Sequence, residues 1–392
     1  MVETGVFFIC VAILISLGIY EKKVIRDSVK KIDLRINVNG IRGKSTATRF
    51  ITAILQDAGY QVVGKTTGTS ARMILWDKEE EIPINRRPIG PNISEQVKVL
   101  KQAADLKANA LVCECMAVNP EYQIVYQHQI VQANIVVITN VVEDHLDLMG
   151  PTTEQISWAF AATIPYNGIL VITEGPYAEY FKAEAEKRNT KVVCVDPESV
   201  EESYLREFPY MVFPNNCAVG LAFAEAMGID KKQAMKAMLK AHPDPGSTQI
   251  VKIEEDNNTC HLINAFAANE PTSSLEIWQQ VCNGPLHKEN AVLIICCRDD
   301  RVDRSHQFVE DFLPYINIKT MVIIGTGTLE VLHEFQKGRF SGIEDCIDLT
   351  DQKSDVIIEE VKKLMCNNVV FCAGNIHGVA EEFLDKFASI KI

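Results

Sequence analysis

The chain has 392 residues, 47% of them hydrophobic and 23% charged, and carries a formal net charge of −13 at pH 7. A chain of this length and apolar content is expected to fold as two globular units rather than around one core. The negative charge excludes a general nucleic-acid binder, because phosphate backbones require a basic face that this composition does not supply. We therefore expect an enzyme-sized protein whose partners do not include DNA or RNA.

The 12 cysteines are scattered along the chain. Cys296 and Cys297 lie in an apolar run, and Cys113 and Cys115 are separated by one residue only, which is not the paired spacing of zinc sites. We interpret them as reduced cytosolic thiols. A disulfide framework or a structural zinc is the less favoured alternative.

The first feature along the chain is an uncharged run from Thr4 to Tyr20. At about 1.5 Å per residue it falls slightly short of the ~30 Å hydrocarbon core of a bilayer, yet it lies within the lower range for a spanning helix. A cleavable signal peptide carries positive charge before its apolar run, whereas here Glu3 precedes and the basic segment 22–31 follows. That flank predicts a single-pass anchor over 1–25 with the catalytic body in the cytoplasm; a buried N-terminal helix is the alternative.

The stretch from Leu34 to Arg49 reads LRINVNGIRGKSTATR and predicts a strand, a glycine turn and a helix in that order. Such a turn cradles phosphate with backbone N–H groups, Lys44 would reach the β- and γ-phosphates, and the Ser45 hydroxyl would hold Mg²⁺. The eight-residue nucleoside-triphosphate loop has a glycine where Val38 stands, but the shorter G-x-x-G-K-[ST] pattern is complete. An ordinary Gly-Lys turn before a helix is the alternative. The expected ATP-binding residues here are Asn39, Gly40, Gly43, Lys44, Ser45 and Thr46.

Two loops are expected after the first helix and the strand at Val62 and Val63. The segment from Gly64 to Met73 is rich in Gly and Thr, which suits a flexible loop over an anionic ligand or, equally, a solvated loop. The segment from Glu79 to Pro91 has charges of both signs and three prolines, which predicts a loop. The candidates for contacting a carboxylate-bearing substrate are Lys65, Thr66, Arg72, Arg86 and Arg87.

Two further strands are expected to bring acidic and imidazole groups to the phosphate turn. Glu114 is the only charge in the apolar run from Ala110 to Val118, and a buried carboxylate needs a cation. At the end of a parallel strand it would meet the nucleotide's Mg²⁺. His145 follows the strand from Ile135 to Asn140 within a carboxylate cluster, which favours a metal or phosphate role over that of an ordinary surface histidine.

The loop NGIRGKST, the glutamate in ALVCECMAV and the stretch TNVVEDHLDLMG occur here in that order. Together they resemble the ATP-binding domain of the Mur ligase and folylpolyglutamate synthetase superfamily. Within it, the stretches ECMAVNP, TIPYNG, NAFAAN and RVDR are similar to the membrane-anchored catalytic subunits of poly-γ-glutamate synthases, with coverage from the anchor to about Ala380. The resemblance implies catalytic roles for Lys44, Glu114 and His145, with Ser45, Glu114 and His145 around the metal.

The remaining chain predicts a second unit. Strands at Ile169–Thr173 and Lys191–Val195 continue the first sheet, and the segment from Ala241 to Gln249 makes a natural hinge. We therefore expect an α/β protein with a P-loop parallel-sheet ATP-binding domain over 26–245 and a smaller Rossmann-like domain over 246–392.

Strands in the second unit are expected at Ala291–Cys296, Thr320–Ile324 and Val369–Cys372. By the same resemblance, polar residues at the strand ends contact ATP. For the segment 298–304 the alternative is a solvent-exposed loop that carries acidic and basic residues. These candidates are Asn264, Asn269, Arg298, Asp299 and Arg301.

The resemblance implies that ATP and Mg²⁺ convert a substrate carboxylate into an acyl phosphate, which the amine of an incoming glutamate attacks. The expected partners are glutamate and the growing chain, the membrane, other membrane subunits of a synthase or export complex, and further copies of the chain. The alternatives are a small-molecule ligase of the folylpolyglutamate or Mur kind and a non-ligase ATPase that drives polymer export.

One departure from the superfamily pattern stands out. Many members carry, shortly after the DHLD-like motif, a lysine whose carbamate supports a second Mg²⁺. The segment from Pro151 to Pro165 contains no lysine, and Phe160 falls near its place. A phenyl ring cannot ligate magnesium, so that metal would depend on His145, phosphate oxygens, water and a nearby carboxylate such as Glu143, Asp144 or Glu154.

Overall fold

The structure is a computed structural model that describes residues 2–67, 71–84, 93–143, 146–205, 207–208, 210–244, 248–255, 258–268, 270–283, 290–365 and 368–389. The chain divides into two units. The first comprises Met1–Phe208 with Val212–Pro245, and the second comprises Pro209–Met211 with Gly246–Ile392.

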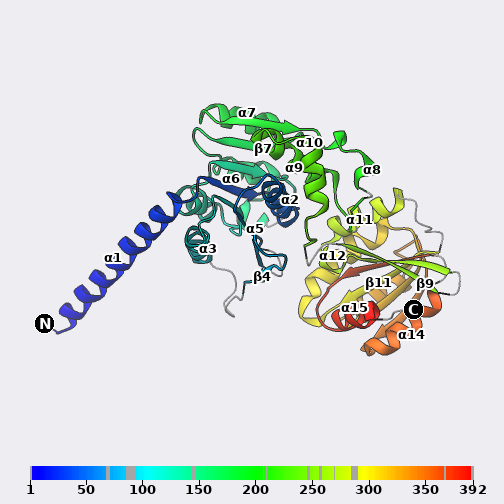
Figure 1. Ribbon diagram of the computed structural model, residues 1–392. Coiled ribbons are helices and arrows are strands. Elements are labelled where there is room, and N and C mark those ends of the chain that lie inside the picture. Colours follow the sequence, from blue (N-terminus) through cyan, green and yellow to red (C-terminus); the bar gives the residue numbers. More distant parts are fainter. Residues whose placement is uncertain are drawn as a thin grey trace. The chain divides into compact units, whose positions relative to one another are not determined.

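The first unit is built on a sheet with the strand order β4-β3-β2-β5-β1-β6-β7-β8 (Figure 1). In this order, each adjacent pair of strands from β2 through β5, β1, β6 and β7 to β8 is parallel. Strands β3 and β4 pair antiparallel at one edge of the sheet. The strands are β1 Leu34–Asn39, β2 Val62–Lys65, β3 Arg72–Leu75, β4 Ile82–Pro83, β5 Ala110–Glu114, β6 Ile135–Ile138, β7 Ile169–Thr173 and β8 Lys191–Val195.

Two groups of helices cover this sheet. One group comprises α2, α9 and α10, and the other comprises α3, α4 and α6. Parallel strands covered on both faces have near-continuous apolar sequences, and all five residues of β5 are buried, Glu114 included. The helices are α1 Val2–Val29, α2 Lys44–Asp57, α3 Ser94–Asp105, α4 Pro120–Val125 followed by the π-helical turn Tyr126–Val131, α5 Leu146–Met149, α6 Thr153–Ala161, α7 Ala178–Glu186, α8 Glu202–Leu205, α9 Pro214–Met227 and α10 Lys231–Leu239.

The second unit has the strand order β13-β12-β11-β14-β10-β9, parallel except for the β9–β10 hairpin. The connections run outward from β11 through β12 to β13 and then return to β14 on the other side of β11. This reversal is the switch point at which open α/β sheets bind ligands. The elements are β9 Gln249–Glu255, β10 Asn258–Asn264, α11 Pro271–Asn283, β11 Val292–Cys297, α12 Val302–Asp311, β12 Ile318–Gly325, α13 Leu329–Gln336, β13 Ile343–Thr350, α14 Ser354–Leu364, β14 Val369–Gly374 and α15 Val379–Ser389.

The α/β class with parallel sheets is confirmed, but several strand predictions were incomplete. The strand predicted to run from Ala110 to Val118 ends at Glu114, and the strand predicted to reach Asn140 ends at Ile138. The hairpin β9–β10 and strand β13 were missed. In β13 Ile343 and Leu349 are buried and the five residues between them are exposed or half-buried, so it lacks the apolar run of the inner strands.

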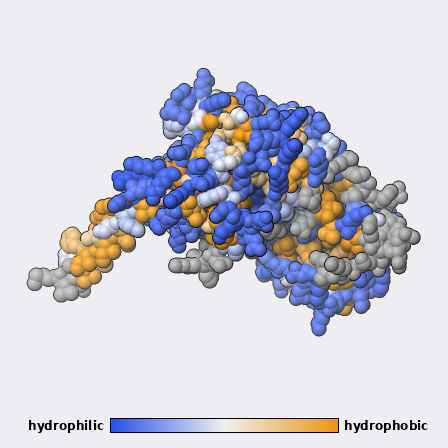
Figure 2. Space-filling view, in the orientation of Figure 1, coloured by the Kyte–Doolittle hydropathy of each residue, from blue (hydrophilic) through white to orange (hydrophobic). Residues whose placement is uncertain are grey.

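The N-terminal run lies in α1, which continues past residue 25 to Val29 and packs its C-terminal part on α3, with Ile25 and Ser28 buried. Its N-terminal part projects from the unit (Figure 1), and its surface there is hydrophobic (Figure 2). The exposed side chains include Phe8 and Leu14. The expected N-terminal helix is thus confirmed. Among the helices formed by described residues, none is both long enough and apolar enough to cross a membrane.

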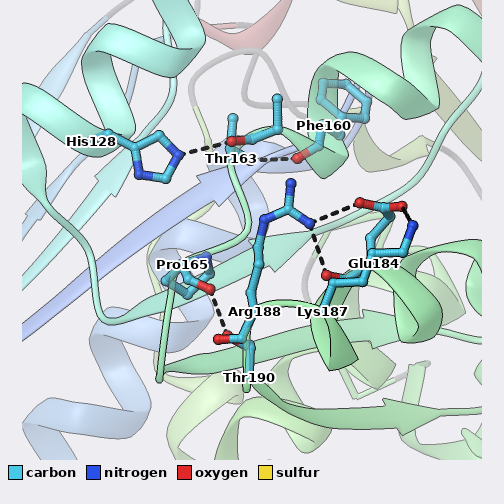
Figure 3. A network of polar contacts seen from close by, with 9 residues as sticks. His128, Phe160, Thr163, Pro165, Glu184, Lys187, Arg188 and Thr190 are labelled. Carbon is cyan, nitrogen blue, oxygen red and sulfur yellow. Dashed lines mark hydrogen bonds and ion pairs between the residues drawn. The ribbon is translucent and has the colours of Figure 1, made fainter.

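Phe160, at the last full turn of α6, is fully buried in the core of the first unit. The chain that follows is held by polar contacts to neighbouring elements (Figure 3): Thr163 Oγ1 donates to the Phe160 carbonyl at 2.7 Å, and His128 Nε2 lies 2.8 Å from the Ala162 carbonyl. Farther on, Thr190 Oγ1 donates to the Pro165 carbonyl. The position that the resemblance associates with a metal-supporting lysine is therefore a packed core position.

We expect Phe160→Ala to lower the free energy of unfolding by about 3–5 kcal/mol, because it leaves a cavity in a closely packed core. Urea denaturation followed by circular dichroism measures the change. The matched control is Trp158→Ala on the same helix, whose side chain is exposed; it should change stability by no more than about 0.5 kcal/mol. Equal effects of the two substitutions would contradict the assignment of Phe160 to the core.

Candidate active site

The turn after β1 requires glycine at two positions. Gly40 has φ +122° and Gly43 has φ +74°, both in the region that side chains rarely adopt. A Cβ at Gly40 would lie 2.2 Å from Thr139 Oγ1, and one at Gly43 would lie 2.1 Å from Asn216 Nδ2. The turn is therefore pressed against the end of β6 and the start of α9.

Helix α2 begins directly after this turn, so its first backbone N–H groups and its dipole favour an anion at this end. The Lys44 ammonium folds back and donates to the carbonyls of Gly40 and Ile41, both at 2.8 Å. Asn39 orders the approach to the turn, since its Oδ1 accepts from the Gly40 N–H at 2.9 Å and its Nδ2 donates to Gln123. The turn therefore presents backbone donors and one lysine at the start of α2.

Glu114 ends β5 beside this turn, because the parallel register sets it opposite Val38. Its side chain is buried, with the residue only 3% exposed. One carboxylate oxygen, Oε2, accepts from the Ser45 hydroxyl at 2.9 Å and from the Thr67 N–H at 2.6 Å. Neutral donors satisfy hydrogen bonding but do not neutralise a buried charge, so this site favours a cation.

The Ser45 hydroxyl and the Glu114 carboxylate together offer hard oxygen donors, which suit Mg²⁺ or Mn²⁺. Within the described ranges, no group of three or more His, Cys, Asp and Glu side chains could hold a metal by itself. The two donors therefore fit a metal that also takes ligands from a bound nucleotide and from water.

Several residues at the turn were missed by the sequence analysis. Asn140 Oδ1 accepts from the Arg42 N–H at 2.9 Å, and Asn216 Nδ2 donates to the Gly43 carbonyl at 3.3 Å. Asn215 Nδ2 donates to the Thr139 carbonyl at 2.8 Å, which ties α9 to the end of β6. The only sequence signal for Asn215 and Asn216 was that they are polar residues at the start of an otherwise apolar helix. That pattern does not predict which groups they contact.

The loop prediction from Gly64 to Met73 is wrong at both ends, because these residues belong to the antiparallel strands β2 and β3. Lys65 is fully buried, and its Nζ lies 2.8 Å from Glu95 Oε1, with angles outside the range for a hydrogen bond. Thr66 is also buried, and its Oγ1 accepts from the Arg72 N–H at 3.1 Å. Lys65 and Thr66 thus lie in the packed interior rather than on a loop open to substrate.

Other predicted residues lie outside the described part of the chain, so their roles stay predictions. These are Arg86, Arg87, His145 and Asn269.

In the second unit, a cavity of ≈350 Å³ opens at the carboxyl ends of β11 and β12. Arg298 lines it and makes a two-pronged contact with Asp300, through Nε at 2.9 Å and Nη2 at 2.7 Å. The Asp299 N–H donates to Thr326 Oγ1 at 3.0 Å, and Arg301 is exposed. These three predicted residues gather at the ligand-binding edge of their own sheet.

Two more polar residues of the second unit lie at strand ends. Asn264 ends β10, and no described group hydrogen-bonds its buried Oδ1. Arg304, which the sequence analysis did not single out, donates from Nη1 to Asn375 Oδ1 at 2.9 Å. Burial lowers the pKa of its guanidinium, and the nearby Arg301 and Arg298 lower it further. Whether these groups contact a nucleotide remains a prediction.

A parallel α/β sheet, a glycine turn with a lysine, and a serine–carboxylate pair define an ATP-binding ligase unit of the Mur type, and residues 38–212 match the Mur ligase middle domain. Residues 250–390 match the poly-gamma-glutamate synthase CapB C-terminal domain. The chain is 47% identical over 384 residues to the PGA synthase CapB of Bacillus subtilis (strain 168), covering 98% of both chains. It therefore belongs to the CapB family of poly-γ-glutamate synthases, as the sequence motifs predicted, and is an ATP-dependent amide ligase.

Solved structures share the fold at low sequence identity. The E. coli FolC in complex with ADP is similar with a TM-score of 0.68 and 18% identity, covering 94% of both chains. A bifunctional folylpolyglutamate synthase/dihydrofolate synthase from Yersinia pestis, complexed with AMPPNP and Mn ion, is similar with a TM-score of 0.64 and 15% identity, covering 94% of this chain and 92% of that one. Both carry an adenine nucleotide, and one a divalent metal.

We expect Glu114→Gln to lower turnover by about 10²-fold or more, because the amide keeps the shape and an acceptor for Ser45 but loses the charge that favours a metal. Steady-state ADP release at several Mg²⁺ concentrations measures the effect, and circular dichroism verifies the fold. Glu121→Gln, at an exposed position on α4, is the matched control. Turnover like that of the unaltered protein would remove Glu114 from the mechanism.

Proposed function

We propose that this chain polymerises glutamate through γ-linked amide bonds by ATP-dependent activation of a carboxylate. The observation that carries the proposal is the Ser45–Glu114 pair at 2.9 Å beside the glycine turn. It is supported by near full-length similarity to a protein named as a PGA synthase. Carboxylates are poor electrophiles, so the chemistry needs the phosphate-binding site that this turn provides.

The proposed reaction has two steps. A carboxylate oxygen of the chain end attacks the γ-phosphorus of ATP, ADP leaves, and an acyl phosphate forms. The amine of an incoming glutamate then attacks the carbonyl carbon, a proton leaves the nitrogen, and inorganic phosphate departs with the former carboxylate oxygen. Because the product again ends in a glutamate, it is a substrate for the next cycle.

In this reaction the N–H groups at the start of α2 bind phosphate, and Lys44 exchanges its present carbonyl partners for phosphate oxygens. Ser45 and Glu114 would hold Mg²⁺, which supplies positive charge beside the phosphates when bound. Thr67 keeps Glu114 oriented through its N–H. We further propose that Asn264, Arg298, Asp299 and Arg301 contact the nucleotide and that water is excluded during the acyl-phosphate stage.

The decisive experiment incubates the protein with ATP, Mg²⁺ and short γ-glutamyl chains or glutamate. We expect one ADP for each amide bond formed, with chains lengthened by whole glutamate units in mass spectra. Phosphate release without any amide would contradict the proposal and favour an ATPase that drives export. Single additions to a folate or a cell-wall precursor, with no elongation of γ-glutamyl chains, would favour a small-molecule ligase.

We also propose that α1 attaches the protein to the membrane, with the two units in the cytoplasm, next to other membrane subunits and further copies of the chain. The support is the exposed apolar side chains between Val6 and Tyr20, followed by the basic segment 22–31. Apolar area of this kind on a projecting helix favours lipid or another apolar helix over water.

We expect removal of residues 2–20 to move the protein from the membrane fraction to the soluble fraction while ATP affinity changes by less than about twofold, since the deleted part precedes the packed part of α1. Fractionation of cell lysates and nucleotide titration measure the two effects. The control is a deletion of equal length at the C-terminal end of α1, which removes the buried Ile25 and should unfold the first unit. Membrane recovery unchanged by the first deletion would contradict the role of α1.

A further inference from the structure

Arg49 lies on α2, one helical turn after Ser45 and therefore on the same side of the helix. Its side chain is only 2% exposed. A guanidinium keeps its charge at every relevant pH, so at this depth it needs anionic partners. The nucleotide-binding helix thus carries a buried charge that the proposed reaction leaves without a role.

The two partners of Arg49 come from distant parts of the first unit. Its Nη1 contacts Glu81 in the turn between β3 and β4, and its Nε lies 3.6 Å from Asp244 Oδ2. Both carboxylates are largely buried, with side chains 14% and 17% exposed. Ion pairs shielded from water in this way are screened little by salt. One cation therefore holds two separate segments against α2.

Each segment leads to a functional part of the chain. The hairpin that carries Glu81 follows the loop whose Thr67 N–H holds the Glu114 carboxylate. Asp244 stands immediately before residues 245–247, where the chain passes from the first unit to the second. Arg49 is therefore paired with the hairpin that follows Thr67 in the chain and with the residue that precedes the interdomain linker.

The contact with Asp244 has room to change. At 3.6 Å the Nε–Oδ2 separation exceeds a hydrogen bond, and no described group hydrogen-bonds the Nε or Nη2 of Arg49. A cavity of ≈190 Å³, lined by Arg49, Glu81, Lys240 and His242, lies beside the Arg49 side chain. The guanidinium thus has free volume beside it, so its separation from Asp244 can shorten or lengthen.

A second ion pair also joins α2 to the last part of the first unit, and it provides a comparison. Lys240, at the end of α10, pairs with Asp57 at the end of α2 at 3.0 Å, but the lysine side chain is 70% exposed. Exposed pairs contribute little, so this contact holds its segment less firmly than the buried pair holds Asp244.

We propose that Arg49 is a positioning residue for ligation: through its ion pair with Asp244 it sets where the linker leaves the nucleotide-binding unit, and so couples ATP turnover to amide formation. The inference rests on the proposed ligase activity. A small displacement of a reacting group costs orders of magnitude in rate, whereas the phosphate-binding turn is held by its own contacts with Asn140 and Asn216. Disturbing the pair should therefore impair amide formation selectively.

The test substitutes Asp244→Asn in the full chain and measures three quantities: ATP affinity, amide formation, and ADP released per amide bond. We expect ATP affinity within about twofold of the unaltered protein, amide formation lowered by about tenfold or more, and a raised ADP-to-amide ratio. Asp244→Glu, which restores the charge, should recover a large part of the coupling. Lys240→Gln, at the exposed pair beside the same cavity, is the matched control and should leave all three quantities unchanged.

Two outcomes would overturn the inference: Asp244→Asn with an unchanged ADP-to-amide ratio, or a loss of ATP affinity as large as the loss of amide formation, which would assign Arg49 a purely structural role. If Asp244→Asn does not fold, Arg49→Lys is tested instead. Lysine keeps the positive charge but lacks the planar guanidinium, whose several N–H groups can reach two carboxylates. An unchanged ADP-to-amide ratio in that variant overturns the inference as well. An unaltered protein that hydrolyses ATP without forming amide would instead refute the proposed function itself.

Discussion

The buried carboxylate of Glu114 is the constraint around which the first unit is arranged. A charge in a strand covered on both faces is tolerated only where donors and a cation can reach it. The parallel register of β1 and β5 brings it beside the glycine turn, where Ser45 and Thr67 donate to it. The register that pairs β1 with β5 therefore also assembles the proposed phosphate and metal site.

Glycine and asparagine residues allow the phosphate-binding turn to pack this closely against the neighbouring elements. Gly40 and Gly43 have no side chain where the turn meets Thr139 and Asn216. The amides opening α9 then bond to the backbone of the turn and of β6. A turn supported on several sides needs little reorganisation when an anion arrives, which is the condition for electrostatic stabilisation of phosphoryl transfer. The second unit gathers its charged groups at the carboxyl edge of its own parallel strands in the same manner.

The sequence by itself determined the fold class, the phosphate turn and the family. Continuous apolar strands alternate with amphipathic helices, Gly40 and Gly43 precede Lys44 at short range, and the ordered motifs are specific to one family. These signals are local, because each depends on neighbouring residues and on the period of one element. Glu114 could be singled out for the same reason, as a lone charge in an apolar run.

Only the tertiary structure decided which side chains meet across elements. From sequence, Lys65 belonged to an open loop, whereas pairing of β2 with β3 buries it against Glu95. The sequence analysis assigned no role to Arg49, whose partners Glu81 and Asp244 lie 32 and 195 positions farther along the chain. Contacts between residues so far apart depend on strand order and helix packing, which no local period encodes.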